Sequence, residues 1–182
     1  MLAKYFLTAQ GHAGEHAAAL AQLDLLLESK PERLVVVIVG SGLMASDAAL
    51  AYIDLLASAT SDIAICSYAN LIGPTFALWL TASDVREIRP NAWAYVPRNS
   101  SIAEASREGS VVTLTAEATF SGPDYAKCLD LIAQHIELET CFERLLRPPE
   151  LREWNLVAID HLAEMAMREP SPEPRRFPTH ER

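Results

Sequence analysis

Histidines are the side chains of this sequence best suited to metal binding or proton transfer. His12 and His16 are four residues apart at the start of an expected helix, and with Glu15 between them they could hold a metal ion. No further ligand follows at a supporting spacing. We therefore interpret the pair as the solvated start of a helix and expect no metal and no cofactor.

Two further histidines lie on expected helices. His135 falls midway along an apolar helical stretch and is interpreted as a surface or interface residue rather than as a general base. His161 has Asp160 and Glu164 as neighbours and is typical of an exposed helical face.

A glycine-rich turn, Gly40-Ser41-Gly42, follows an apolar stretch and precedes an expected helix. Main-chain N–H groups at a helix start can bind phosphate. However, the turn has neither the third glycine of a dinucleotide-binding motif nor the lysine of a P-loop, so the phosphate signal is weak.

Charge and cysteine content exclude several classes of protein. Fifteen Lys and Arg against 24 Asp and Glu give a net charge of −9, which disfavours nucleic acid and anionic membranes as partners. The three cysteines form no paired motif, which favours a reducing compartment. No apolar run approaches the roughly 20 residues that span a bilayer, so we expect a cytoplasmic protein with no membrane segment.

The elements that position these residues follow an alternating pattern. Apolar β-branched runs predict strands, and apolar residues at i, i+3 and i+7 predict helices. The run of residues 34–39 has no polar alternation, as in a strand buried on both faces of a parallel sheet. Strands are expected at residues 3–8, 34–39 and 62–67, and helices at 15–29, 46–59 and 74–83; this alternation predicts a layered α/β domain.

The second half of the chain is less regular. We expect a polar segment at residues 99–109, a long helix from residues 121–124 to Leu146, and helices at 150–154 and up to Met167. Strands are expected at residues 92–96 and, as an edge strand, at 111–119. Residues 168–182 hold four of the eleven prolines and are predicted to be a disordered tail, which leaves residues 1–167 as a single domain.

Five stretches resemble, in order, the proteolytic subunit of the Clp protease in the ClpP and crotonase superfamily. They are residues 5–10 (Tyr-Phe-Leu-Thr-Ala-Gln) with the following helix, 31–42, 63–83, the Arg-Pro-Asn of 89–91 and Pro-Glu-Leu-Arg-Glu-Trp-Asn-Leu-Val at 149–157. The resemblance covers residues 4–158. It implies a layered α/β fold with a mostly parallel sheet, flanking helices and a strand-helix extension. It also implies a serine protease of stacked heptameric rings with a Ser-His-Asp triad and an oxyanion hole.

The resemblance places the chemistry on residues that cannot perform it. The nucleophile falls on Pro74 and the imidazole on Pro97, and proline has neither a hydroxyl nor an ionisable ring. The triad acid falls near Glu143. A one-residue shift would bring Thr75 to the nucleophile position, and a larger shift would bring Ser67, but neither shift supplies a histidine.

The resemblance also identifies the loop that would form the oxyanion hole, and this loop lacks the family's glycines. It falls on residues 40–44, so the family's paired glycines become Leu43 and Met44 after Gly42. We therefore expect a non-catalytic homologue, a pseudo-peptidase that acts as an oligomeric scaffold or a regulatory, peptide-binding subunit. A peptide could dock by strand addition at Val111–Thr119. The expected partners are further copies of the chain, in a ring or otherwise, a Clp peptidase paralogue or an AAA+ unfoldase.

Two enzymatic alternatives remain open. A crotonase-type enzyme would bind an acyl-CoA with N–H groups of the Gly42-Leu43 turn and of the helix start near Gly73. A residual serine- or threonine-type peptidase would use Thr75 or Ser67 as its nucleophile.

Overall fold

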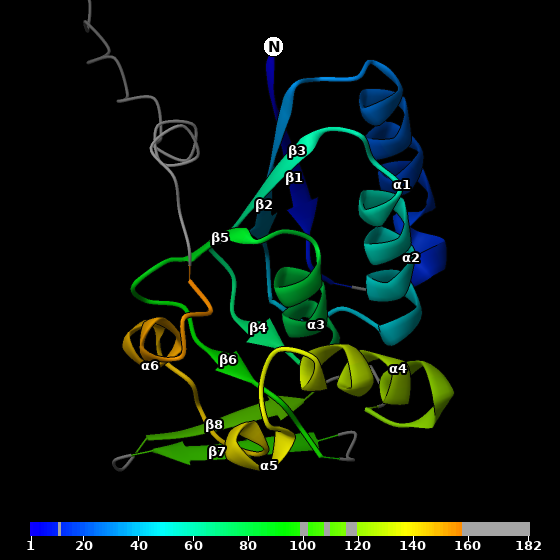
Figure 1. The fold of residues 1–182 in the computed structure, drawn as a ribbon. Coiled ribbons are helices and arrows are strands. Elements are labelled where there is room, and N and C mark those ends of the chain that lie inside the picture. Colours follow the sequence, from blue (N-terminus) through cyan, green and yellow to red (C-terminus); the bar gives the residue numbers. More distant parts are fainter. Residues whose placement is uncertain (11, 99–101, 108–109, 116–119, 158–182) are drawn as a thin grey trace, which may run out of the picture.

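The computed structural model describes residues 1–10, 12–98, 102–107, 110–115 and 120–157, and for 102–107 and 110–115 it describes the main chain alone. The elements in these ranges alternate as predicted for an α/β protein (Figure 1). They are β1 (Leu2–Thr8), α1 (Ala13–Glu28), β2 (Arg33–Val39), α2 (Ser46–Ala57), β3 (Asp62–Ser67), β4 (Leu71–Ile72), α3 (Pro74–Thr81), β5 (Val85–Ile88), β6 (Ala94–Tyr95), β7 (Ile102–Arg107), β8 (Ser110–Thr115), α4 (Gly122–Ala133), α5 (Leu138–Cys141) and α6 (Pro148–Glu153).

A parallel sheet forms the centre of the fold. Its four strands run in the order β1-β2-β3-β5, and all three strand pairs are parallel. Val36 of β2 lies between Tyr5 of β1 and Ile65 of β3. Strand β5 was not predicted, because Val-Arg-Glu-Ile is short and half polar.

Strand β2 is buried on both faces, as its uninterrupted β-branched run predicted. Leu34, Val36 and Ile38 join the main core, and Val35 and Val37 point to the opposite face. Helices α1 and α2 lie side by side over the first of these faces (Figure 1). Helix α3 packs against α2 and α4, so the main core continues from the sheet into the lower half of the molecule.

A second, smaller layer carries the turn that precedes α3. Strands β4 and β6 pair in parallel, and Leu43, just after the glycine-rich turn, makes a parallel bridge to Ile72 of β4. Strands β7 and β8 form an antiparallel hairpin. Strand β7 lies within the polar segment expected at residues 99–109, and it was not predicted because cross-strand pairing decides its conformation.

The predicted long helix from residues 121–124 to Leu146 is confirmed as far as Ala133 and is wrong as one continuous helix beyond that residue. Helix α4 ends at Ala133, α5 has four residues, and the chain then pairs with β6 and the residue after it. Phe142 bridges Val96 and Leu146 bridges Ala94, with hydrogen bonds of 2.8 Å in both directions between Ala94 and Leu146. Main-chain groups committed to these strands cannot also form a helical ladder.

The remaining predictions are settled in part. Helix α6 lies where residues 150–154 were expected. The predicted final helix up to Met167 and the tail at residues 168–182 lie outside the described residues, as do residues 116–119 of the predicted edge strand. Within the described ranges, no helix combines the length and the apolar character needed to cross a bilayer.

Candidate functional site

The glycine-rich turn after β2 is held tightly against the chain before β4. A Cβ on Gly42 would lie 1.8 Å from the carbonyl oxygen of Asn70, and Gly42 has a φ of +78°, so only glycine fits there. The N–H of Ile72 donates to the Gly42 carbonyl at 3.3 Å. The turn thus brings residues 40–44 beside the start of α3, as the resemblance implies.

The two residues that follow Gly42 are not built as an open oxyanion hole. Met44 is fully buried in the main core, and Leu43 is half-buried. The N–H of Leu43 donates to the hydroxyl of Ser41 at 3.4 Å. An oxyanion hole needs N–H groups that point at the reacting oxygen, and this one is turned towards its own loop.

The start of α3 has the geometry of a sharp strand-to-helix turn. Gly73 follows β4 with φ +48° and ψ −105°, outside the regions that residues with a side chain favour, and Pro74 begins the helix. Turns of this kind hold the nucleophile in several hydrolases. Here the N–H of Gly73 donates to the Tyr95 carbonyl at 2.8 Å, so it is not directed at a ligand.

Two aromatic rings pack against that turn. A Cβ built on Gly73 would lie 3.2 Å from the ring of Tyr125 and 3.4 Å from the ring of Phe120. Both residues are buried, and their ring centroids are 5.6 Å apart. The space beside the turn is therefore filled by side chains that enter from the start of α4.

The Tyr125 hydroxyl links this turn to Pro97. It donates a hydrogen bond to the Pro97 main-chain carbonyl, and Pro97 is itself buried. Burial, with a smaller contribution from the nearby Cys128 thiol, raises the pKa of Tyr125. One neutral phenol thus contacts both Gly73, the residue before Pro74, and Pro97. The resemblance assigned the nucleophile to Pro74 and the base to Pro97.

The alternative hydroxyls are both deeply buried. Thr75 has no exposed surface, and its Oγ1 has no hydrogen-bond partner within the described part of the chain. Ser67 is equally buried and donates to the carbonyl of Ala69 at 2.7 Å. A nucleophilic hydroxyl needs a base within hydrogen-bond reach and access to substrate.

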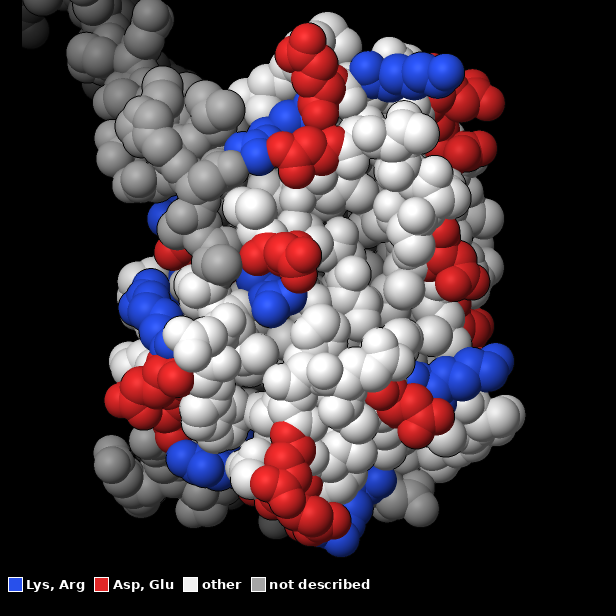
Figure 2. Space-filling view, viewed as in Figure 1, with Lys and Arg blue, Asp and Glu red and all other residues white. Residues whose placement is uncertain are grey.

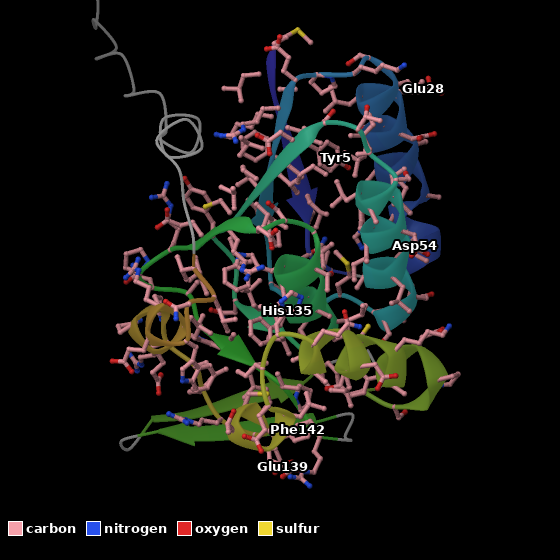
Figure 3. All side chains as sticks on the ribbon, in the orientation of Figure 1. Tyr5, Glu28, Asp54, His135, Glu139 and Phe142 are labelled. Carbon is pink, nitrogen blue, oxygen red and sulfur yellow. The ribbon has the colours of Figure 1, made fainter. Side chains whose placement is uncertain are left out.

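Histidine does not supply that base among the described residues. His135, labelled in Figure 3, is exposed after α4. Its electrostatic neighbours are Arg86 and Asp84, which follow α3 in the chain. Burial and the Arg86 charge lower the pKa of His135. Among the described residues, the hydroxyl of Thr75 has no hydrogen-bond partner and that of Ser67 donates to Ala69, so neither is paired with His135.

His16 is not part of a solvated helix start, and this prediction is wrong. The residue is 5% exposed, its Nδ1 lies 2.9 Å from the Tyr52 hydroxyl, and its Nε2 contacts the Gln10 carbonyl. A neutral ring with hydrogen on Nε2 satisfies both partners. The cause is tertiary: α1 packs against α2 and turns this face inward.

His12 remains exposed, as expected for the start of α1. The described ranges hold no cluster of three His, Cys, Asp or Glu side chains able to bind a metal ion. Glu143 lies beside Val96, with its N–H donating to the Val96 carbonyl at 2.9 Å, but its side chain is exposed. The chain thus brings the predicted acid position close to Pro97 through the backbone.

The sequence did not predict a hollow that lies between strand β1, at the edge of the sheet, and helix α1. It has a volume of about 570 Å³ beside β1 and the first turns of α1, with Tyr5, Phe6 and Gln22 among its walls. Glu15 and His16 of the metal candidates line it, whereas Pro74, Pro97, Thr75 and Ser67 do not. The sequence therefore pointed to two residues of this hollow, Glu15 and His16, but not to the hollow itself.

No protein-family model matches this chain, and no curated protein matches it by sequence. Solved structures do match. A membrane-bound stomatin-specific protease, 1510-N, has a TM-score of 0.62 at 13% identity, over 91% of this chain and 83% of that one. The ClpP protease catalytic domain from Plasmodium falciparum has a TM-score of 0.57 at 13% identity, over 94% and 88%.

ClpP1 from Listeria monocytogenes is similar to the same extent, with a TM-score of 0.56 at 15% identity over 84% of this chain and 88% of that one. These likenesses define the class: the chain has the ClpP-like fold, a mixed α/β architecture with a parallel sheet flanked by helices. The fold that the resemblance implied is therefore confirmed.

Proposed function

We propose that this protein is a non-catalytic ClpP-like homologue, a pseudo-peptidase that acts as an oligomeric scaffold or regulatory subunit in the cytoplasm. The observation that carries the proposal is the aromatic filling of the turn at Gly73. Catalysis of acyl transfer needs a hydroxyl, a base and an oxyanion hole around a space that the substrate can enter. Here Tyr125 and Phe120 occupy the space, and the flanking positions are Gly73, Pro74 and Pro97.

The donors required by the acyl-CoA alternative are already used. The N–H of Gly73 is bonded to Tyr95, and the N–H of Leu43 is bonded to Ser41. An enolate or thioester oxygen would have to displace both partners and the aromatic pair. These contacts favour a scaffold over an acyl-CoA enzyme.

A scaffold role is supported by what the chain retains. The sheet, the three helices on it and the sharp turn before α3 are all present, although the chemistry that this geometry would position is not. We propose that the protein assembles with copies of itself, in a ring or otherwise. A Clp peptidase paralogue or an AAA+ unfoldase is its proposed partner.

The test is labelling with a fluorophosphonate probe, read by intact mass, beside an active Clp peptidase subunit. We expect the control to be labelled and this protein to stay unmodified, while light scattering after size exclusion gives the mass of an oligomer. An adduct mapped to Thr75 or Ser67 would revive the peptidase. A monomer at micromolar concentration would remove the oligomeric scaffold.

A further inference from the structure

Strand β1 lies at an edge of the parallel sheet and, within the described chain, has a strand partner on one side only. The N–H of Ala9 donates to the Val39 carbonyl at 2.8 Å, and the N–H of Arg33 donates to the Met1 carbonyl at 3.4 Å. A parallel strand bonds to one neighbour at every second residue, so the odd-numbered residues of β1 are those bonded to β2. The even-numbered residues therefore direct their N–H groups away from the sheet. These four exposed residues are Leu2, Lys4, Phe6 and Thr8.

The hollow of about 570 Å³ follows the same edge on the side of α1. Strand β1 contributes Tyr5 and Phe6 to its walls, and α1 contributes Ala19 and Gln22. The Tyr5 hydroxyl donates to the Ala19 carbonyl at 2.7 Å, which places the middle of β1 against the middle of α1. The edge is thus open beside the middle of both elements.

Helix α1 presents a row of small and then large apolar side chains beside this hollow. Ala18 lies four residues before Gln22 and Leu25 lies three residues after it, so both share its side of the helix. Ala18 is exposed, and Leu25 is 65% exposed. Ala19 and Leu26 repeat the arrangement one residue further on and are half-buried. Alanines therefore precede Gln22 on this side, and leucines follow it.

A second copy of the chain fits this edge with its own β1 in the antiparallel direction. Tyr5 is the middle residue of β1, so a two-fold axis at Tyr5 pairs all four outward residues. It places Lys4 of one copy opposite Phe6 of the other, whereas an axis at Lys4 would oppose two like charges. Within one chain, the Lys4 ammonium already lies 5.0 Å from the centroid of the Phe6 ring. The Tyr5 register repeats this favourable contact between copies.

The same axis suits the helices. It passes α1 near Gln22, because Tyr5 contacts the middle of that helix, and it sets the alanines of one copy opposite the leucines of the other. Helix α1 connects β1 to β2 and packs on the sheet over the two strands that it joins. The two α1 helices are then two strand spacings apart, about 10 Å, which is a distance at which helices pack.

We propose that two copies of this chain join edge to edge through β1, so that their sheets become continuous and their α1 helices pack across the axis. The hollow is then the space between the two helices. The contact is isologous, because each copy uses the same residues, and it closes at two copies. The proposal rests on the oligomeric scaffold proposed above and assigns its interface.

Lys4→Pro tests the main-chain contact. Proline removes an N–H that points away from β2, so β1 keeps its bonds within the chain but cannot pair outwards there. Lys4→Ala removes the same charge and keeps the N–H. By light scattering after size exclusion, we expect Lys4→Ala to keep the mass of the parent oligomer. Lys4→Pro should have at most half that mass, with an unchanged circular dichroism spectrum.

The outcome separates this interface from the scaffold itself. Equal masses for the two Lys4 variants would overturn the β1 interface and leave an oligomeric parent as a scaffold. A monomeric parent would overturn both proposals.

Gln22→Cys tests the same interface through α1 and leaves β1 unchanged, so it decides the question even where Lys4→Pro does not fold. The axis brings the two copies of residue 22 together, and oxygen with copper–phenanthroline should oxidise their thiols to a disulfide. Ala17→Cys is the control, because Ala17 is also exposed but lies about 140° around α1 from residue 22. On non-reducing gels we expect at least about fivefold more linked dimer from Gln22→Cys. Equal yields would overturn the proposal.

Discussion

The Tyr125 hydroxyl donates a hydrogen bond to the main-chain carbonyl of Pro97, and the ring of the same residue packs on Gly73 at the start of α3. One side chain thus joins two positions that are 24 residues apart in the chain.

Figure 2 shows acidic and basic side chains interspersed over the visible face rather than gathered at one place. Around α3, the buried donors Arg86 and Tyr125 form hydrogen bonds with main-chain carbonyls of the protein itself.

Removal of the Tyr125 hydroxyl should destabilise the fold without creating activity. Tyr125→Phe leaves the buried Pro97 carbonyl without its donor, at a cost of about 1–3 kcal/mol in the free energy of unfolding. Tyr125→Ala should cost about 3–5 kcal/mol because it also opens a cavity. Urea unfolding measures both. Tyr68→Phe removes a hydroxyl that accepts a hydrogen bond from Arg89 on a 36% exposed residue, and it should cost less than Tyr125→Phe because water can replace the lost partner.

Gly42 and Gly14 form a matched pair for alanine substitution. Gly42→Ala places a Cβ 1.8 Å from the Asn70 carbonyl oxygen and should destabilise by about 3 kcal/mol or more. Gly14→Ala lies in α1 with no atom within 4 Å of the new Cβ and should stabilise by about 0.5–1 kcal/mol. Thermal unfolding of the two variants distinguishes them. Equal loss in both would show that the close approach of residue 70 is not rigid.

The buried thiols predict a loss of stability at alkaline pH. Burial raises the pKa of Cys66 and Cys128 to about 12 and that of Cys141 to about 11, against an ordinary value of 9.0. Above the unfolded pKa, the unfolded chain releases protons that the folded chain keeps. Stability is therefore full below about pH 8 and falls by at most about 1.4 kcal/mol per pH unit for each thiol above pH 9.

Urea unfolding at several pH values between about pH 7.5 and 10 checks this thiol effect. The variant with all three cysteines changed to alanine should lose less stability over this range than the parent. The tyrosines act in the same direction only at higher pH, since burial raises the pKa of Tyr5 and Tyr95 from 10.0. Parallel pH profiles in both proteins would contradict the prediction.

Arg86 should be required for the end of the described chain to stay in place. Its guanidinium lies 5.7 Å from the Trp79 ring centroid and donates to three carbonyls, those of Leu80, Ser83 and Leu156. Arg86→Lys keeps the charge but cannot form this fork, so we expect a loss of about 2–4 kcal/mol. Amide exchange should accelerate most at residues 151–157. Uniform acceleration over the whole sheet would instead indicate a global role.

Local patterns were sufficient for the central sheet and its helices. The β-branched run of 34–39, the apolar spacing of 15–29 and the proline at 74 each carry their own conformational preference, and β2, α1 and α3 form at these places. The same approach failed for the stretch from His135 to Leu146. There, pairing with Ala94 and Val96 outweighed a helical apolar pattern, and such long-range pairing leaves no local signal.

The candidate site likewise has features that the sequence determined and features that only the tertiary structure determined. The identities of Pro74 and Pro97 are properties of the sequence, and no fold can give proline a hydroxyl or an imidazole. That the Tyr125 and Phe120 rings fill the space beside Gly73, and that His16 turns inward to Tyr52, was decided only by the tertiary structure. Residue type is local, whereas contact between α1 and α2 or between α4 and α3 depends on how whole elements pack.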